Sequence, residues 1–103
     1  MDFGLKEAEI EGIRNVLSGF PAIKEAVIYG SRAKGTYRPG SDIDLVLKGD
    51  YLSLTDLNPI CLALDDLLLP YTFDVSIYER LADKNLLDHI QRVGQVLYKR
   101  DDS

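Results

Sequence analysis

The feature that most constrains the fold of this chain is the segment 28–47, which reads IYGSRAKGTYRPGSDIDLVL. It holds a Gly-Ser pair directly after one apolar run and an Asp-Ile-Asp set at the start of a second. Side chains two residues apart on a β-strand project from the same face, so we expect Asp42 and Asp44 to face one volume. Two adjacent carboxylates repel each other, and burying them without a counter-charge is costly. The segment therefore predicts a divalent cation bound between Asp42 and Asp44.

The Gly-Ser pair indicates an anion site. Gly30 and Ser31 follow a short apolar run and precede Arg32, an order that predicts a strand, a tight turn and a short helix. Backbone N–H groups and the positive end of a helix attract phosphate at such a turn, and glycine permits close approach. Arg32, Lys34 and Arg38 add positive charge; a solvated loop is an equal alternative for each, and only Arg32 is assigned to the site. A phosphate site followed by paired acids is typical of proteins that handle a nucleoside triphosphate with magnesium.

The spacing of these residues resembles a family signature. The motif G-S-x-A-x-G at 30–35, followed by S-D-I-D-L at 41–45, is similar to that of the DNA polymerase β-type nucleotidyltransferase superfamily. Within that superfamily, the short chain and the later Asp74 resemble the minimal nucleotidyltransferases (MNT), the antitoxin half of HEPN–MNT pairs. The resemblance implies an α/β (α+β) fold, a polymerase β-type palm in which helices pack on one face of a small mixed β-sheet.

The composition fits a single domain spanning residues 1–103. A chain of 103 residues is expected to bury roughly two thirds of the surface that its unfolded form exposes. Its 46% hydrophobic and 28% charged residues are ordinary for a globular protein and exclude a disordered one. The lone Cys61 permits no internal disulfide, which fits a reducing compartment. With no apolar run near ~18 residues and no basic signal region, we expect a cytoplasmic protein without a membrane partner.

The net charge of −5 argues against a long nucleic-acid substrate. Affinity for a phosphate backbone comes largely from clustered Lys and Arg, which an acidic chain lacks overall. A magnesium-bound triphosphate needs only a local basic cluster, because the metal neutralises much of its charge. The chain is therefore expected to bind a nucleotide rather than DNA or RNA, and the resemblance names ATP.

Hydrophobic periodicity predicts the remaining elements. Helices are expected at 5–18, 55–69 and 84–93, and strands at 24–29, 43–48, 71–78 and 96–98. Thr55 or Asn58 is expected to cap the second of these helices, which keeps Pro59 within its first turn. The adjacent Asp65 and Asp66 point about 100° apart on that helix and are expected to be surface charge.

The stretch 71–78 places a third acid beside the first two. Phe73, Val75 and Ile77 alternate onto one face and leave Asp74 on the other. Aspartate is disfavoured inside a strand, so its presence needs a reason. If this strand lies beside 42–48 with the polar faces aligned, Asp74 joins Asp42 and Asp44; a solvated strand face is the alternative. His89, the only histidine, is expected at the surface, because no residue is spaced to partner it in catalysis.

The resemblance implies a two-metal mechanism. Asp42 and Asp44 would hold two Mg²⁺ ions ~4 Å apart, one on the triphosphate and the other lowering the pKa of the attacking hydroxyl. Asp74 would ligate the hydroxyl-side ion and take the proton. Gly30 and Ser31 would grip the β and γ phosphates with help from Arg32, so that AMP is transferred and pyrophosphate leaves.

The acceptor is expected to be a protein, since no segment remains to bind one after the sheet and helices are counted. The resemblance names a tyrosine hydroxyl of a HEPN ribonuclease toxin, which makes the chain a protein adenylyltransferase (EC 2.7.7.-) and the antitoxin. One alternative is a binding module that neutralises the toxin by covering its active site. Another is a small-molecule nucleotidyltransferase of the aminoglycoside-modifying kind, which needs a second domain or a dimer. A homodimer and a hetero-oligomer with the toxin are both compatible with the sequence.

Overall fold

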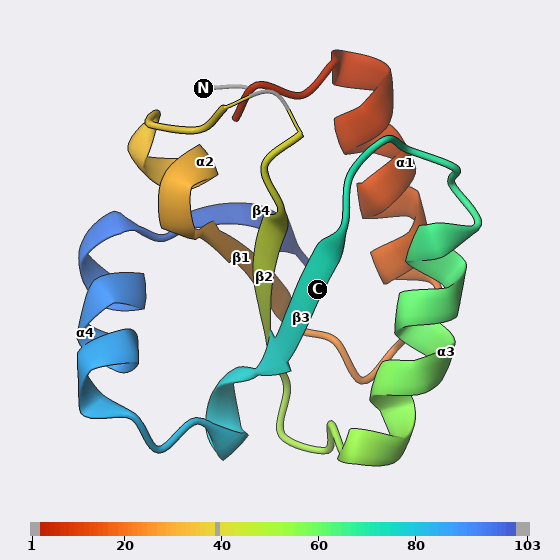
Figure 1. The fold of residues 1–103 in the computed structure, drawn as a ribbon. Coiled ribbons are helices and arrows are strands. Elements are labelled where there is room, and N and C mark those ends of the chain that lie inside the picture. The colour runs from red at the N-terminus through yellow and green to blue at the C-terminus, as the bar shows by residue number, and fades with distance from the viewer. Residues whose placement is uncertain (1–2, 39, 101–103) are drawn as a thin grey trace.

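The computed structural model describes residues 3–38 and 40–100. The elements along the chain are α1 (Glu7–Ser18), β1 (Glu25–Tyr29), α2 (Gly30–Lys34), β2 (Ile43–Lys48), α3 (Leu54–Asp65), β3 (Phe73–Ile77), the 3-10 helix η1 (Tyr78–Arg80), α4 (Lys84–Val93) and β4 (Gln95–Lys99) (Figure 1). The predicted bounds of β2 and α4 match the observed ones, and the other predicted strands differ only at their ends.

The four strands form one mixed sheet in the order β3-β2-β1-β4. β1 is antiparallel to both β2 and β4, whereas β2 and β3 run parallel. A parallel pair needs a crossover connection, and α3 provides it between β2 and β3. The small mixed sheet that the sequence predicts is confirmed, with the two acid-bearing strands as neighbours.

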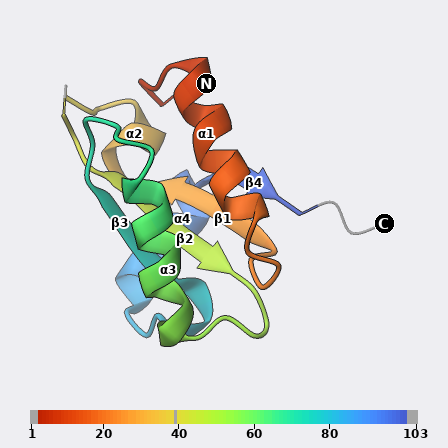
Figure 2. The same cartoon turned by 90° about the vertical axis from the view of Figure 1, so that its right-hand side faces the viewer.

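Helices cover both faces of this sheet, which differs from the one-sided packing expected from the sequence. α1 and α3 lie on one face, and α2 and α4 lie on the other (Figures 1 and 2). The reason is that β1 is apolar on both sides: Ala26 and Ile28 join the core under α1 and α3, whereas Val27 and Tyr29 pack with Ile90 of α4. A strand with two apolar faces needs cover on both sides, and α4 supplies the second layer.

The larger core fixes β2 and thereby the acids that it carries. Ile43, Leu45 and Leu47 all point into this core and have no exposed surface. Burying a side chain of this size contributes roughly 1.5–3 kcal/mol. Because side chains alternate along a strand, Asp44 and Val46 point to the opposite face, toward α4. A slip of one residue would bury Asp44, so the register of β2 is strongly specified.

The helices depend on caps and packing, because each has at most 12 residues. α3 begins earlier than predicted, since Ser53 caps it and its backbone N–H donates to Asp56 Oδ2 at 2.9 Å. Pro59 therefore lies inside the helix beyond the first turn. α3 also ends earlier, and Leu68 follows with a positive φ of 57°. No helix in the described ranges is long and apolar enough to cross a membrane.

Candidate metal and nucleotide site

Three acids lie together where β2 and β3 begin. Asp44 pairs in register with Asp74 across the parallel ladder, and pairs with Tyr29 of β1 on its other side. Asp42 lies two residues before Asp44, just ahead of the first residue of β2. Neighbouring strands lie about 4.8 Å apart, so the register brings the backbones of Asp44 and Asp74 together.

The electrostatics of these acids centre on Asp44, which is half-buried, whereas Asp42 and Asp74 are exposed. Burial raises the pKa of the Asp44 carboxyl, and the negative charges of Asp74 and Asp42 raise it further. None of the three carboxylates has a hydrogen bond or ion pair within residues 3–38 and 40–100. No ion pair in these ranges therefore offsets this concentration of negative charge.

The chemistry of these donors fits Mg²⁺, which prefers carboxylate oxygens and relieves the repulsion between them. In their present conformations the side chains do not form a complete metal-binding site. No three His, Cys, Asp or Glu residues of the described part of the chain are close enough together to hold a metal ion. The ladder fixes the backbones of Asp44 and Asp74, whereas the exposed carboxylates of Asp42 and Asp74 are free of packing restraints.

Gly30 lies directly against this acid group. Its φ of +76° is in the left-handed region, where residues with a Cβ are strained. A Cβ built at this position would overlap Oδ2 of Asp44. The backbone conformation therefore favours glycine at the junction of β1 and α2, and a Cβ there would displace the Asp44 carboxylate from its present position.

Ser31 follows Gly30 in the first turn of α2 and is half-buried. Its carbonyl accepts hydrogen bonds from the N–H groups of Gly35 and Thr36, while its hydroxyl makes no hydrogen bond within the described part of the chain. α2 has only five residues, so its macrodipole is weaker than that of a full-length helix. An anion at this turn would find the nearby backbone N–H groups and the Ser31 hydroxyl as hydrogen-bond donors.

Arg32 is placed differently from the phosphate-contacting position that the sequence suggests. It is only 2% exposed. Its Nε and Nη2 donate to the Ser41 carbonyl at 3.1 and 2.9 Å, and its Nη1 donates to the Phe3 carbonyl at 2.8 Å. Its guanidinium lies 4.7 Å from the ring centroid of Tyr71 and 5.3 Å from that of Tyr37. The guanidinium is thus engaged inside the protein, next to the acid site rather than in it.

His89 and Tyr29 are residues of this face that the sequence reasoning missed. Their ring centroids are 6.2 Å apart in an edge-on arrangement, and the His89 ring acts to lower the pKa of Asp44. Burial raises the pKa of Tyr29, followed by the charges of Asp44 and Asp74. His89 is half-buried rather than at the surface as expected. The available signal was its place three residues after Leu86, on the apolar face of α4.

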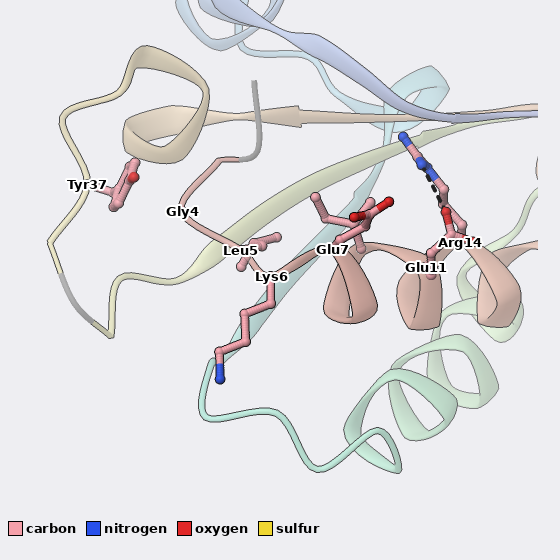
Figure 3. Close-up of a pocket in the computed structure, with 8 residues that line it drawn as sticks. Gly4, Leu5, Lys6, Glu7, Glu11, Arg14 and Tyr37 are labelled. Atoms are coloured by element: carbon pink, nitrogen blue, oxygen red, sulfur yellow. Dashed lines mark hydrogen bonds and ion pairs between the residues drawn. The ribbon is translucent and has the colours of Figure 1, made fainter.

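A groove of about 790 Å³ lies at the start of α1 (Figure 3). Within it, Arg14 forms an ion pair with Glu11 at 3.4 Å, and its Nε donates to the Leu97 carbonyl of β4 at 2.8 Å. Gly4 and Tyr37 line its other end. None of the three acids lines the groove, so we do not assign the chemistry to it.

The model of the family described as polymerase beta, nucleotidyltransferase matches residues 11–103. The chain belongs to the polymerase β nucleotidyltransferase family. Nucleotidyltransferases of this fold generally use divalent metal, which agrees with the acids on the α4 face. None of the curated proteins matches this nucleotidyltransferase in sequence at a significant level.

Solved structures share the fold of this nucleotidyltransferase at low sequence identity. A toxin–antitoxin structure with AMP-PNP has a TM-score of 0.70 at 22% identity, covering 93% of this chain and 75% of that one. A tri-AMPylated HEPN toxin in complex with its MNT antitoxin, from Shewanella oneidensis, gives 0.69 at 17%, with 93% and 74% covered. A putative nucleotidyltransferase from Sulfolobus solfataricus gives 0.52 at 21%, with 94% and 92% covered.

Proposed function

We propose that this nucleotidyltransferase moves AMP from ATP to a hydroxyl group of a protein partner, and that the partner is a HEPN toxin for which the chain is the antitoxin. The observation that carries the proposal is the register of Asp44 beside Asp74, on a face bounded by Gly30, in a member of this family. The proposed unit is one domain, residues 1–103, acting in the cytoplasm.

Each residue of the site has a proposed role in binding the donor. Asp42 and Asp44 hold Mg²⁺, and Asp74 completes the ligand set from the neighbouring strand. Gly30 and Ser31 receive the β and γ phosphates of ATP through backbone N–H groups and the Ser31 hydroxyl. Mg²⁺ held by these residues would offset the charge of the carboxylates and of the triphosphate and would lower the pKa of the attacking hydroxyl. Arg32 is not given a phosphate contact, because its guanidinium is engaged with the carbonyls of Ser41 and Phe3.

The proposed reaction is an in-line displacement at the α-phosphorus. The acceptor oxygen bonds to that phosphorus, the bond from phosphorus to the bridging oxygen breaks, and pyrophosphate leaves. The acceptor hydroxyl loses its proton to the carboxylate of Asp74, which is exposed at the edge of the site. The products are an adenylylated partner, pyrophosphate and one proton that passes to solvent.

The nature of the acceptor is supported by the relatives. Two of the similar structures described above are toxin–antitoxin complexes, of which one contains AMP-PNP and the other contains a tri-AMPylated HEPN toxin. AMP on a toxin that is bound to an MNT antitoxin is the product expected from the proposed reaction. A tyrosine hydroxyl of the toxin is the acceptor that we propose for this chain.

A second candidate is a binding module that neutralises the toxin by forming a complex without transfer. The observation that favours it is the arrangement of the acids, which are not grouped into a finished metal site in the described part of the chain. In that case the negative charge around Asp44 is used for contact with a basic partner surface. The two functions differ in whether the partner becomes covalently labelled.

The deciding experiment incubates the protein with its toxin partner, Mg²⁺ and ATP labelled on either the α or the γ phosphate. Label retained on the partner from the α position alone supports adenylyl transfer. Label from the γ position indicates a kinase, and complex formation without label indicates the binding module. Asp42→Asn and Asp44→Asn are the matched controls, because they remove ligand charge while conserving side-chain size.

A further inference from the structure

Arg32 is the one charged side chain within residues 3–38 and 40–100 that is fully buried. A buried cation is costly unless it is paired or well hydrogen-bonded. No carboxylate forms an ion pair with Arg32 in these ranges. Its guanidinium instead contacts backbone carbonyls and two tyrosine rings. A guanidinium group suits this environment because its planar set of N–H groups can donate hydrogen bonds in several directions at once.

The partners of Arg32 lie at the starts of the two acid-bearing strands. Two of its N–H groups converge on the carbonyl of Ser41, the residue directly before Asp42. One face of the guanidinium contacts Tyr71, which directly precedes Thr72. The Thr72 carbonyl accepts the Ile43 N–H at 2.8 Å, so the two chain segments are also joined to each other. One buried cation therefore connects the segments that lead into β2 and β3.

Asp42 depends on this connection more than the other two acids do. Asp44 and Asp74 lie within paired strands, whose ladder holds their backbones in register. Asp42 precedes β2, at the end of a turn in which the Arg38 N–H donates to Ser41 Oγ at 2.8 Å and the Ser41 N–H donates to the Arg38 carbonyl at 2.9 Å. The bonds from Arg32 to the Ser41 carbonyl tie this turn to the interior on one side of Asp42, and the bond from the Ile43 N–H to the Thr72 carbonyl holds the other side.

We propose that Arg32 is a positioning residue for the metal site. By holding the Ser41 carbonyl, it sets the backbone of Asp42 relative to the Asp44–Asp74 pair, and thereby the geometry in which the three carboxylates bind a divalent cation. The inference rests on the proposed function, because it assumes that these acids bind metal. It gives the buried arginine a role in the site without any contact with nucleotide or metal.

The test compares Arg32→Lys with a matched control, Arg100→Lys. Arg100 also donates to two backbone carbonyls, those of Ile23 at 3.2 Å and Phe20 at 3.1 Å, but it is remote from the acids. Lysine keeps the charge and loses the fork in both variants. The measurements are Mn²⁺ affinity of the folded protein by water-proton relaxation, thermal unfolding, and the Mg²⁺ dependence of α-label transfer.

We expect both variants to unfold at a lower temperature, but only Arg32→Lys to bind Mn²⁺ about 10-fold or more weakly, as supporting residues of metal sites do when replaced. Excess Mg²⁺ is expected to restore the transfer rate of Arg32→Lys but not that of Asp42→Asn, because the first variant retains all its ligands. Mn²⁺ affinity equal to that of the unaltered protein in folded Arg32→Lys would overturn the inference.

A second variant keeps the test decisive if Arg32→Lys does not fold. Tyr37→Leu removes one ring beside the guanidinium, and Tyr37 is 38% exposed, so the variant is expected to fold. It should weaken Mn²⁺ binding measurably, and unchanged affinity would again count against the inference. If the unaltered protein and Asp42→Asn bind Mn²⁺ equally, the proposed function fails together with the inference. If Asp42→Asn loses binding while the Arg32 and Tyr37 variants keep it, the inference alone fails.

Discussion

The carboxylate of Asp44 lies where a Cβ on Gly30 would stand, so that a side chain at the junction of β1 and α2 would displace this carboxylate. We therefore expect Gly30→Ala to abolish nucleotide transfer and to destabilise the protein. The left-handed backbone alone costs an alanine roughly 1–2 kcal/mol, and the overlap with Asp44 adds to that. Urea unfolding and α-label transfer measure the two effects.

The control for this prediction is Gly35→Ala. Gly35 has a φ of +81°, close to the +76° of Gly30, but a Cβ there meets no atom within 4 Å. The backbone strain is therefore shared by the two variants, and only the overlap with Asp44 differs. We expect Gly35→Ala to lose roughly 1–2 kcal/mol and to keep its transfer activity. Equal losses of stability and activity in both variants would refute the argument.

Asp44 is expected to destabilise the metal-free protein at neutral pH. Burial and the neighbouring acids raise the pKa of its carboxyl in the folded state, so the folded protein binds more protons than the unfolded chain over the pH range between the two values. Stability attributable to this group falls as the pH rises through that range, and the loss is complete above the folded pKa. Asp44→Asn removes the effect and should be more stable than the unaltered protein at pH 7.

The expected gain from Asp44→Asn is a few degrees in Tm in the presence of a chelator. About 1 kcal/mol moves Tm by roughly 4–8 °C in a domain of this size, and solvent screening reduces the effect at a half-exposed group. The gain should shrink as the pH is lowered toward 3, where the aspartate is protonated in both states. Asp66→Asn, at an exposed position on the end of α3, is the control and should change Tm little.

The sequence predicted the placement of the acids because that placement depends on local alternation. Ile43, Leu45 and Leu47 assign one face of β2 to the core, which leaves Asp44 on the other face wherever the strand lies. Asp74 is assigned in the same way by Phe73, Val75 and Ile77. Only the pairing of β2 with β3 is non-local, and the polar faces of the two strands aligned as expected.

The burial of Arg32 and the cover provided by α4 could not be predicted in this way, because both depend on distant contacts. Arg32 lies close to Lys34 and Arg38 in the sequence, a pattern that is typical of an exposed basic segment. Its hydrogen-bond partner Phe3 is 29 residues away along the chain. The periodicity of 84–93 predicted a helix but carried no information about which face of the sheet it covers. The pattern that indicates a second helical layer is in β1. Val27 and Tyr29 lie on one face of this strand and Ala26 and Ile28 on the other, so both faces are apolar and need cover.

His89 is expected to act through packing against Tyr29 rather than through chemistry. Loss of an edge-on aromatic contact costs about 0.5–1.5 kcal/mol, so His89→Ala should lose stability in that range. His89→Phe keeps a ring at the same position and should retain stability. Both variants should keep α-label transfer, and loss of transfer in the stable His89→Phe variant would instead give the imidazole a chemical role.

Magnesium is expected to reverse the pH dependence of stability that Asp44 imposes. Metal binds the deprotonated carboxylates, so its contribution grows as the pH rises, in contrast to the metal-free protein, whose Asp44 contribution falls. At a metal concentration 100 times the dissociation constant, binding to the folded state adds about 2.7 kcal/mol. Tm measured against pH with Mg²⁺ should therefore slope upward, and with EDTA it should be flat or slope downward across the titration of Asp44.

The variants Asp42→Asn and Asp74→Asn separate this effect from a general action of salt. Each removes one proposed ligand while leaving the charge of Asp44 in place, so each should lose most of the stabilisation by Mg²⁺. Screening of the acids by a monovalent salt is expected to raise Tm slightly in all variants alike, because screening does not depend on a particular ligand. If Mg²⁺ raises the Tm of the variants as much as that of the unaltered protein, the three acids act only as a concentration of surface charge, and the binding-module function gains support over transfer.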